Sequence, residues 1–207
     1  MAERGCLIAF EGIEGAGKST QIRRVAAVLS ARSVAVVETR EPGGTAVGTE
    51  VRRILMQLSE TPPTPLAELL LYLADRAQHV AQVIAPAIAS GQVVLTDRFS
   101  ASTIAYQGYA RRLDLAMVTR LDAIARQGVA PALTVLLDCP VEMGLQRARG
   151  DDRFHREEQE FHERVRAGFL SLAREDWDRY CVIDATAPPE EIERQAVAAV
   201  MQCLNPR

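Results

Sequence analysis

The sequence predicts an α/β protein in which a parallel sheet carries helices on both faces. Three observations predict it. Short apolar segments such as residues 7–10 recur along the chain, amphipathic segments with helical spacing separate them, and glycine or proline falls between the two kinds. Strands buried on both faces are continuously apolar, and parallel strands require crossover helices. The expected order is β-α-β-α(α)-β-α(α)-β-α-β-α, with five strands in one sheet.

The elements follow in order along the chain. The expected strands are residues 7–10, 34–37, 92–96, 134–138 and 181–183. Apolar residues at helical spacing predict helices around residues 22–29, 47–55, 66–84, 161–172 and 192–204, with further helical segments between the third and fourth strands. The proline-rich residues 61–65 end one helix, and Pro86 predicts a kink or an end in the long one.

Composition indicates one ordinary globular domain over residues 1–207. Apolar residues make up 48% and charged residues 25%, and the formal net charge is −3, which does not favour a nucleic-acid-coating protein. No apolar run reaches the roughly 18 residues of a membrane span, and the first ten residues do not resemble a signal peptide. The four cysteines form no CxxC pair. We expect a cytoplasmic protein with reduced thiols and without a zinc site, a nucleic-acid partner or a membrane partner.

A phosphate-binding loop follows the first strand. Gly12, Gly17, Lys18 and Ser19 fit the pattern G-x-x-x-x-G-K-[ST] between an expected strand and an expected helix. Glycine allows backbone N–H groups to turn towards phosphate oxygens, and the helix N-terminus adds positive potential. Lys18 is the single lysine among 24 basic residues, which singles out a site that needs a compact ammonium.

The loop predicts binding of a nucleoside triphosphate. Lys18 is expected to contact the β- and γ-phosphates, and Ser19 to ligate Mg²⁺. The expected phosphate-binding residues are Gly12, Ile13, Glu14, Gly15, Ala16, Gly17, Lys18, Ser19 and Thr20. A GTPase needs an N-K-x-D motif, which a chain with one lysine at position 18 lacks. A ring ATPase does not fit in 207 residues. Small phosphotransferases remain.

Further motifs extend the pattern beyond the loop. The chain reads Phe-Glu-Gly-Ile-Glu-Gly-Ala-Gly-Lys-Ser-Thr at 10–20, Thr-Arg-Glu-Pro-Gly-Gly-Thr at 39–45, Asp-Arg-Phe at 97–99 and Ser-Thr-Ile-Ala-Tyr-Gln-Gly at 102–108. This combination resembles the bacterial thymidylate kinase family nearly end to end. The resemblance implies a P-loop NTPase fold with a short lid at about 146–157. It also implies transfer of phosphate from Mg-ATP to dTMP, which gives dTDP for dTTP biosynthesis, and a homodimer.

Asp97 and Arg98 end the third expected strand. The carboxyl edge of a doubly wound sheet is where ligands bind, so the Asp97 carboxylate is expected to hold Mg²⁺ together with Ser19. Arg98 can pair bidentately with a phosphate, and the resemblance assigns it the monophosphate of the acceptor. Glu14 is unusual beside phosphates. We expect it to face away and accept a hydrogen bond from a sugar hydroxyl, which the resemblance identifies as the deoxyribose 3′-hydroxyl.

The acceptor pocket is expected around a long helix. Tyr72 and Arg76 lie four residues apart on one face, and the resemblance implies that Tyr72 stacks on thymine while Arg76 bonds its O4. Thr103 and Tyr106 would close the pocket, with Tyr106 opposing a 2′-hydroxyl, and Gln107 would bond the base edge. The expected dTMP-binding residues are Glu14, Glu41, Pro42, Tyr72, Arg76, Arg98, Thr103, Tyr106 and Gln107.

The lid is expected to supply a catalytic arginine, since the phosphate loop holds Gly15 and Ala16 where some family members carry one. Arg153 is the first choice and Arg149 the second, so the expected catalytic residues are Lys18, Arg98, Arg153 and Arg149. The chain departs from the family at His155, where glutamate is usual.

Simpler interpretations stay open at this stage. Arg98 and Arg76 would also suit salt bridges, Tyr72 a core position, Glu14 a helix-dipole interaction and the lid arginines a solvated helix end. The enzymatic alternative is another small P-loop kinase that acts on a deoxynucleoside, another nucleotide or a small metabolite. For a nucleoside acceptor, Glu11 or Glu14 would be the base near the 5′-hydroxyl. A nucleotide-dependent switch is an alternative from another class.

Overall fold

A five-stranded parallel sheet forms the centre of the molecule. The computed structural model describes residues 5–148, 153–154 and 157–205. Within these residues the strand order is β2-β3-β1-β4-β5. The strands are β1 (Cys6–Glu11), β2 (Val36–Arg40), β3 (Val93–Asp97), β4 (Leu133–Asp138) and β5 (Tyr180–Asp184). The predicted α/β class and the five parallel strands are confirmed.

Helices connect every pair of consecutive strands. They are α1 (Lys18–Ala31), α2 (Ala46–Met56), α3 (Pro65–His79), α4 (Ala85–Ala89), α5 (Ser100–Thr103), α6 (Leu115–Arg126), α7 (Val141–Arg147), α8 (Gln159–Glu175) and α9 (Pro189–Leu204). Two π-helical turns, η1 (Val80–Ile84) and η2 (Ile104–Ala110), continue α3 and α5, and the 3-10 turn η3 (Trp177–Arg179) precedes β5. Side chains of Thr45, Thr64 and Asp114 cap the starts of α2, α3 and α6.

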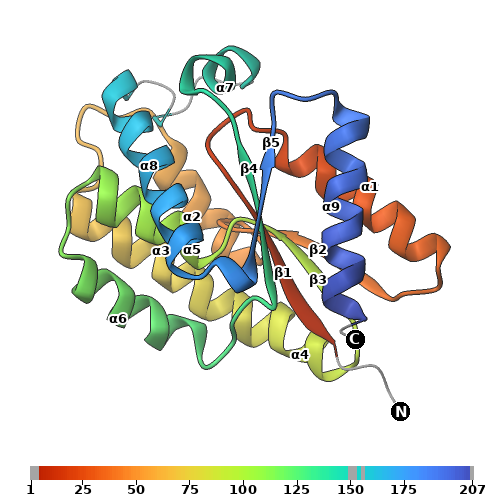
Figure 1. Cartoon of the computed structure of the whole chain (residues 1–207). Helices are drawn as coiled ribbons and strands as arrows, with labels where there is room; N and C mark the ends of the chain where they lie inside the picture. Colours follow the sequence, from red (N-terminus) through yellow and green to blue (C-terminus); the bar gives the residue numbers. More distant parts are fainter. Residues whose placement is uncertain (1–4, 149–152, 155–156, 206–207) are drawn as a thin grey trace.

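The helices form a layer on each side of the sheet (Figure 1). Helices α1 and α9 pack together on one side, and α3, α4 and α8 cover the other. The largest core cluster joins the strands to α1, α8 and α9 through fully buried residues such as Val25, Val135 and Phe169. Because both faces are covered, β1 and β4 are apolar at nearly every position, as the sequence pattern predicted.

The second strand lies later than predicted. Residues 34–37 were expected, but β2 runs from Val36 to Arg40. The backbone N–H of Val34 donates to the Leu29 carbonyl, so Val34 still belongs to the end of α1. Pairing with β3 then carries the strand on through Glu38, Thr39 and Arg40, although these residues are polar.

Pro86 does not end its helix. The chain stays helical from α3 through η1 to Ala89, and the π-helical turn ends at Ile84, two residues before the proline. Proline lacks an N–H and crowds the carbonyl one turn back, and a local widening of the helix relieves that contact. The second π-helical turn, η2, carries Tyr106 and Gln107 into the acceptor side of the molecule.

Parallel pairing brings the ends of β1, β2 and β3 together. Phe10 lies opposite Asp97, and Arg40 lies opposite Asp97 on the other side. The turn after β1 and the residues after β3 therefore meet at one edge, and α7 lies over that edge (Figure 1). Among the described helices, we find none with the length and apolarity that crossing a membrane requires.

Candidate active site

The turn after β1 has the backbone of a phosphate loop. The φ angles of Gly12, Gly15 and Gly17 are 139°, 72° and 96°, a region that side chains with a Cβ rarely adopt. Ile13 and Ala16 bury their side chains in the core, so they offer only backbone groups to a ligand. The loop thus has the predicted geometry because glycine stands at each turning point.

Lys18 lies inside this loop. Its ammonium donates hydrogen bonds to the carbonyl oxygens of Gly12 and Ile13 at 3.0 and 2.8 Å. Burial, and after it the charge of Arg98, lowers the pKa of Lys18 to about 8. The compact ammonium on its flexible stem fits where a planar guanidinium would not, which agrees with the single lysine of the sequence.

Gly15 lies against helix α7. A Cβ atom on Gly15 would overlap the carbonyl oxygen of Gly144, and a Cβ on Gly144 would lie 2.6 Å from the carbonyl oxygen of Glu14. Both glycines are therefore needed for the close approach of the phosphate loop and α7. This contact also explains why the loop carries no side chain at position 15.

Oxygen ligands for a divalent cation meet beside the loop. The Ser19 hydroxyl donates to Oδ2 of Asp97 at 2.5 Å, so the helix start and the end of β3 hold these two oxygens together. Mg²⁺ prefers oxygen ligands and usually takes one or two from the protein, completing its shell with water and phosphate. The donor set of Ser19 and Asp97 therefore fits Mg²⁺.

A cavity of about 720 Å³ opens above the phosphate loop. It is lined by Glu14, Gly15, Gly17, Lys18, Ser19, Thr20, Arg23, Arg40, Glu41, Arg52, Asp97, Arg98, Arg147 and Ala148. Six of these residues are cationic and three are anionic. A polyanion such as a nucleoside triphosphate matches this excess of positive charge.

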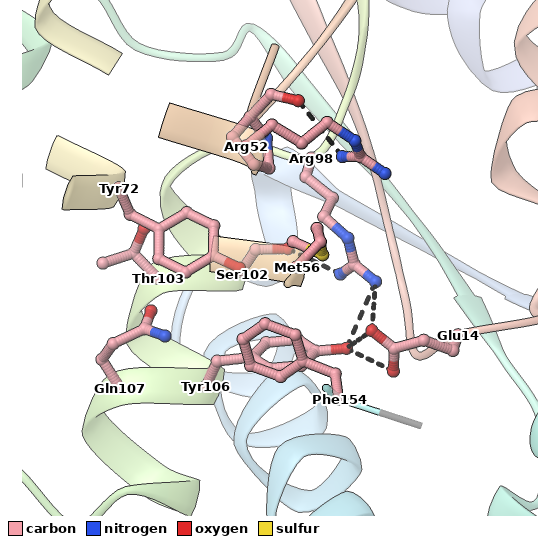
Figure 2. Close-up of a pocket in the computed structure, with 11 residues that line it drawn as sticks. Glu14, Arg52, Met56, Tyr72, Arg98, Ser102, Thr103, Tyr106, Gln107 and Phe154 are labelled. Carbon is pink, nitrogen blue, oxygen red and sulfur yellow. Dashed lines mark hydrogen bonds and ion pairs between the residues drawn. The ribbon is translucent and has the colours of Figure 1, made fainter. Parts of the chain in front are cut away.

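A second, smaller pocket adjoins this cavity (Figure 2). Its volume is about 130 Å³, and it is lined by Glu14, Pro42, Arg52, Met56, Tyr72, Arg98, Ser102, Thr103, Tyr106, Gln107 and Phe154. Seven of the nine predicted dTMP-binding residues line this pocket, namely Glu14, Pro42, Tyr72, Arg98, Thr103, Tyr106 and Gln107. Aromatic rings and polar groups converge, as small-molecule sites require.

Arg98 lies at the boundary, since it lines both cavities. Its guanidinium donates to the Gly12 carbonyl at 3.1 Å, to Ser102 Oγ at 2.9 Å, to Glu14 Oε1 at 2.9 Å and to the Tyr106 hydroxyl at 3.2 Å. The backbone φ of Arg98 is 75°, a strained value for a residue with a side chain, and such strain is common at functional sites.

Glu11 holds the turn that carries Arg98. Its fully buried carboxylate accepts hydrogen bonds from the backbone N–H groups of Phe99 and Ser102 and from the Ser102 hydroxyl. Ser102 Oγ in turn accepts from Arg98. Glu11 therefore helps to position Arg98 through Ser102. It lines neither the phosphate cavity nor the smaller pocket, so its carboxylate is not placed to act as a base there.

Glu14 lines both cavities, and its carboxylate is directed towards Arg98 and Tyr106 in the smaller pocket (Figure 2). The Tyr106 hydroxyl donates to its carboxylate at 2.7 Å. Burial raises the pKa of Glu14, but the Arg98 charge and the contacts with His162 and Lys18 outweigh it, so the pKa lies well below its usual value. That Glu14 faces the acceptor sugar stays a prediction, and its contacts with Arg98 and Tyr106 place its carboxylate on the acceptor side.

Arg76 and Glu41 lie behind the pocket wall. Arg76 is 1% exposed, and its guanidinium binds Glu41 and Asp122 in ion pairs and donates to Thr103 Oγ1 at 2.8 Å. Glu41 also contacts His79 Nδ1 at 2.9 Å. The structure does not place Arg76 among the pocket-lining residues, because two buried carboxylates hold its guanidinium. Glu41 borders only the larger cavity.

Comparison with known proteins decides the family. A family model described as thymidylate kinase matches residues 10–196. The thymidylate kinase of Geobacter sulfurreducens is 49% identical over 210 residues, which cover 97% of each chain. That of Carboxydothermus hydrogenoformans is 50% identical over 192 residues, 91% of this chain and 93% of the relative. The chain belongs to the thymidylate kinase family. The crystal structure of thymidylate kinase from Ehrlichia chaffeensis superposes with a TM-score of 0.77 at 31% identity, covering 95% of this chain and 98% of that one.

As a thymidylate kinase family member, the chain is a nucleoside monophosphate kinase. Its lid arginines were predicted to contact the transferred phosphoryl group. Arg153 donates to the Leu55 carbonyl at 3.1 Å and to Glu68 Oε2 at 2.5 Å, which places it beside the acceptor pocket and away from the phosphate loop. Arg147 lines the phosphate cavity instead and donates to the Ala185 carbonyl at 2.7 Å. Arg149 and His155 lie outside the described residues.

Several pocket residues of this family member were not singled out from the sequence. They are Arg52, Met56, Ser102 and Phe154 around the acceptor pocket and Arg23 and Arg40 around the phosphate cavity. Arg52 lies on α2 and lines both cavities, and only its place about two turns after the Gly43-Gly44 loop could have indicated it. Phe154 is 2% exposed and packs edge-on against Tyr106, a contact that spans 48 residues of sequence.

Proposed function

We propose that this protein transfers the γ-phosphoryl group of Mg-ATP to dTMP, giving ADP and dTDP for dTTP biosynthesis. The observation that carries the proposal is the place of Arg98, which lines both the phosphate cavity and the smaller pocket. A guanidinium at that boundary can hold the acceptor phosphate next to the donor phosphates. Membership of the thymidylate kinase family supports the same reaction.

Positioning and charge neutralisation carry most of the work in phosphoryl transfer. A phosphate oxygen of dTMP attacks the γ-phosphorus, the bond to the bridging oxygen breaks, and ADP leaves with that electron pair. The acceptor oxygen is already anionic, so the reaction demands no general base. Lys18 and Arg98 face the reacting groups, and Arg147 extends the positive charge of the cavity towards the donor nucleotide.

Ser19 and Asp97 would hold Mg²⁺ on the phosphates. When bound, the ion would neutralise charge that develops on the transferring group. The lid arginine that contacts this group remains a prediction for Arg153 and Arg149.

The smaller pocket suits a deoxynucleoside monophosphate. Tyr72 offers a ring for stacking on the base, and the Glu14–Tyr106 pair offers polar groups for the sugar. The Tyr106 ring would oppose a 2′-hydroxyl and so favour deoxyribose. Arg52, which lines both cavities, would assist Arg98 at the acceptor phosphate.

The contacts of Glu11 and Glu14 favour a monophosphate over a nucleoside as acceptor. Glu11 is fully buried against Phe99 and Ser102. Glu14 is bound by Arg98 and Tyr106, which depresses its basicity. A nucleoside kinase needs a base near the 5′-hydroxyl. The guanidinium of Arg98 stands beside Glu14 instead, and a guanidinium binds a phosphate but cannot accept a proton from a hydroxyl.

We infer a cytoplasmic location from family membership. We infer a homodimer from family membership and from the exposed apolar side chains of two adjacent helices. Large apolar side chains that are 41–50% exposed gather on α2, α3 and their connection: Val47, Ile54, Leu58, Leu66 and Leu70. Helices α2 and α3 pack against each other, and several exposed apolar side chains on two packed helices are typical of a protein interface. A second copy of the chain would cover it.

The first experiment is an ADP-release assay with Mg-ATP and a panel of acceptors, namely dTMP, dUMP, UMP, CMP, AMP, GMP and thymidine. We expect dTMP to be preferred over dUMP and all the others. Faster turnover of thymidine or of a purine monophosphate would overturn the acceptor assignment and leave ATP binding intact. Acceptor-independent ADP release, or none, would overturn the kinase reaction itself.

A further inference from the structure

A buried carboxylate on α3 joins the acceptor pocket to the lid segment. Glu68 is fully buried, and its Oε1 accepts hydrogen bonds from Gln107 Nε2 at 2.8 Å and from Arg111 Nε at 3.2 Å. Its Oε2 accepts from Arg153 at 2.5 Å. A buried charge is tolerated where it is paired and hydrogen-bonded, and two guanidinium groups satisfy that condition here.

Glu68 determines which end of the Gln107 amide faces the pocket. A carboxylate paired with two guanidinium groups only accepts hydrogen bonds, so the amide NH₂ must point to it. The amide carbonyl oxygen then points the other way. Figure 2 shows this oxygen directed towards Thr103 and Tyr72, two other residues of the pocket. Gln107 is 1% exposed, so solvent does not compete for the amide.

Thr103 is oriented by a buried charge in the same way. Its Oγ1 accepts a hydrogen bond from Arg76 at 2.8 Å, and a guanidinium can only donate. The Thr103 hydroxyl proton is thus left to donate elsewhere. The part of the pocket where the nucleotide base would lie therefore presents a hydroxyl donor from Thr103 beside a carbonyl acceptor from Gln107 (Figure 2).

We propose that Glu68 is a positioning residue that sets the base preference of this site, by locking the Gln107 carbonyl oxygen towards the base. A donor next to an acceptor matches the C=O and N–H edge of thymine or uracil. Cytosine presents NH₂ and an unprotonated ring nitrogen there, so it meets both groups with the wrong polarity. The inference rests on the proposed function, because it assumes a pyrimidine monophosphate in this pocket.

The test compares dTMP with 5-methyl-dCMP, which differ only at this edge. We expect the ratio of their kcat/KM values to fall at least about 10-fold in Glu68→Gln, because an amide can bond either orientation of Gln107. The loss should appear in KM for the acceptor, with KM for ATP unchanged. Glu157→Gln is the matched control, since Glu157 bonds the same Arg111 at 2.5 Å and does not contact Gln107 in the hydrogen bonds described.

The possible results separate this inference from the proposed function. An unchanged ratio in folded Glu68→Gln overturns the inference, as does an equal fall in Glu157→Gln. If Glu68→Gln fails to fold, Glu68→Asp takes its place, because it keeps the negative charge for the arginines but is one methylene shorter and so draws back from Gln107. An unchanged ratio of kcat/KM values in Glu68→Asp also overturns the inference. If the unmodified protein turns over neither nucleotide, the proposed function fails instead. Thermal melting of each variant reports folding.

Discussion

Arg98 and Glu14 form an ion pair of 2.9 Å at the boundary between the phosphate cavity and the acceptor pocket. The pair joins the end of β3 to the phosphate loop after β1, so parallel strand pairing sets its geometry. In the proposed reaction Arg98 has an anion on each side, the acceptor phosphate and the Glu14 carboxylate. The ion pair keeps the guanidinium in place before the acceptor arrives, which reduces the ordering needed on binding.

Replacing Arg98 should impair the acceptor far more than the donor. In Arg98→Ala we expect kcat/KM for dTMP to fall about 100-fold or more, since a charge-assisted phosphate contact is lost and Glu14 is left unpaired. KM for ATP should change little. Steady-state kinetics with each substrate varied at saturating levels of the other test this, and equal losses for both substrates would contradict the role of Arg98.

Lys18 should be essential for turnover but not for the fold. Its ammonium contacts only backbone carbonyl oxygens of the loop in the hydrogen bonds described, and the core clusters are built from apolar side chains. We expect Lys18→Ala to lower kcat by about 100- to 1,000-fold, the usual cost of a lost charge-stabilising donor. Circular dichroism and Tm should match those of the unmodified protein. Near-normal turnover in a folded variant would remove Lys18 from the mechanism.

The pKa of Lys18 predicts an alkaline limit to ATP use. With a pKa of about 8, lowered first by burial, the ammonium is charged below that pH and neutral above it. We therefore expect kcat/KM for ATP to decline above about pH 8. Bound phosphates favour the charged form, so the same decline in kcat should lie at higher pH. A profile of kcat/KM that stays flat through this range would contradict the titration.

Two glycines with positive φ should respond differently to alanine. Gly15 and Gly128 have φ of 72° and 83°, but a Cβ overlaps α7 at Gly15 and meets nothing within 4 Å at Gly128. Gly128→Ala should cost about 1–2 kcal/mol of stability and keep activity. Gly15→Ala should cost more and lower kcat, since the loop and α7 must separate. Denaturant unfolding and kinetics compare them, and indistinguishable variants would show that the contact with Gly144 is unimportant.

The inferred dimer should depend on the exposed apolar surface of α2 and α3. We expect Leu70→Arg, at a side chain that is 50% exposed, to give a monomer in light scattering after size exclusion. Val182→Arg is the control, because Val182 is 48% exposed but lies on the edge strand β5. A dimer that survives Leu70→Arg, or a protein that is monomeric throughout, would contradict this interface.

The fold and the phosphate loop could be predicted because their signals are local. Alternating apolar runs determine the sheet, and glycines at turning points determine the loop, so both depend on neighbours in sequence. Strand β2 shows the limit, since its polar half is set by pairing with β3 and not by its own apolarity. A strand boundary that depends on pairing with another strand cannot be predicted from the residues of that strand alone.

The acceptor side was harder to predict because its roles depend on distant partners. Arg76 shares a helix face with Tyr72, as expected, but Glu41 and Asp122 hold its guanidinium behind the pocket wall. The spacing of two residues in the sequence predicts whether they share a helix face. It does not predict which carboxylates of other elements lie opposite that face. Arg52 lines the pocket from α2, where no motif marked it. Phe154 lines the pocket from the lid segment, where the sequence pattern drew attention to the neighbouring Arg153 and gave Phe154 no role.

The single lysine has a consequence for covalent chemistry on this protein. Every other cationic side chain is a guanidinium or an imidazole, so reagents that acylate primary amines meet only one side-chain target. That target is the ammonium of Lys18 in the phosphate loop, a residue that is 7% exposed and whose pKa is lowered to about 8 by burial and by the charge of Arg98. We therefore expect labelling of the Lys18 side chain to inactivate the protein, and a bound nucleotide to prevent both the labelling and the inactivation.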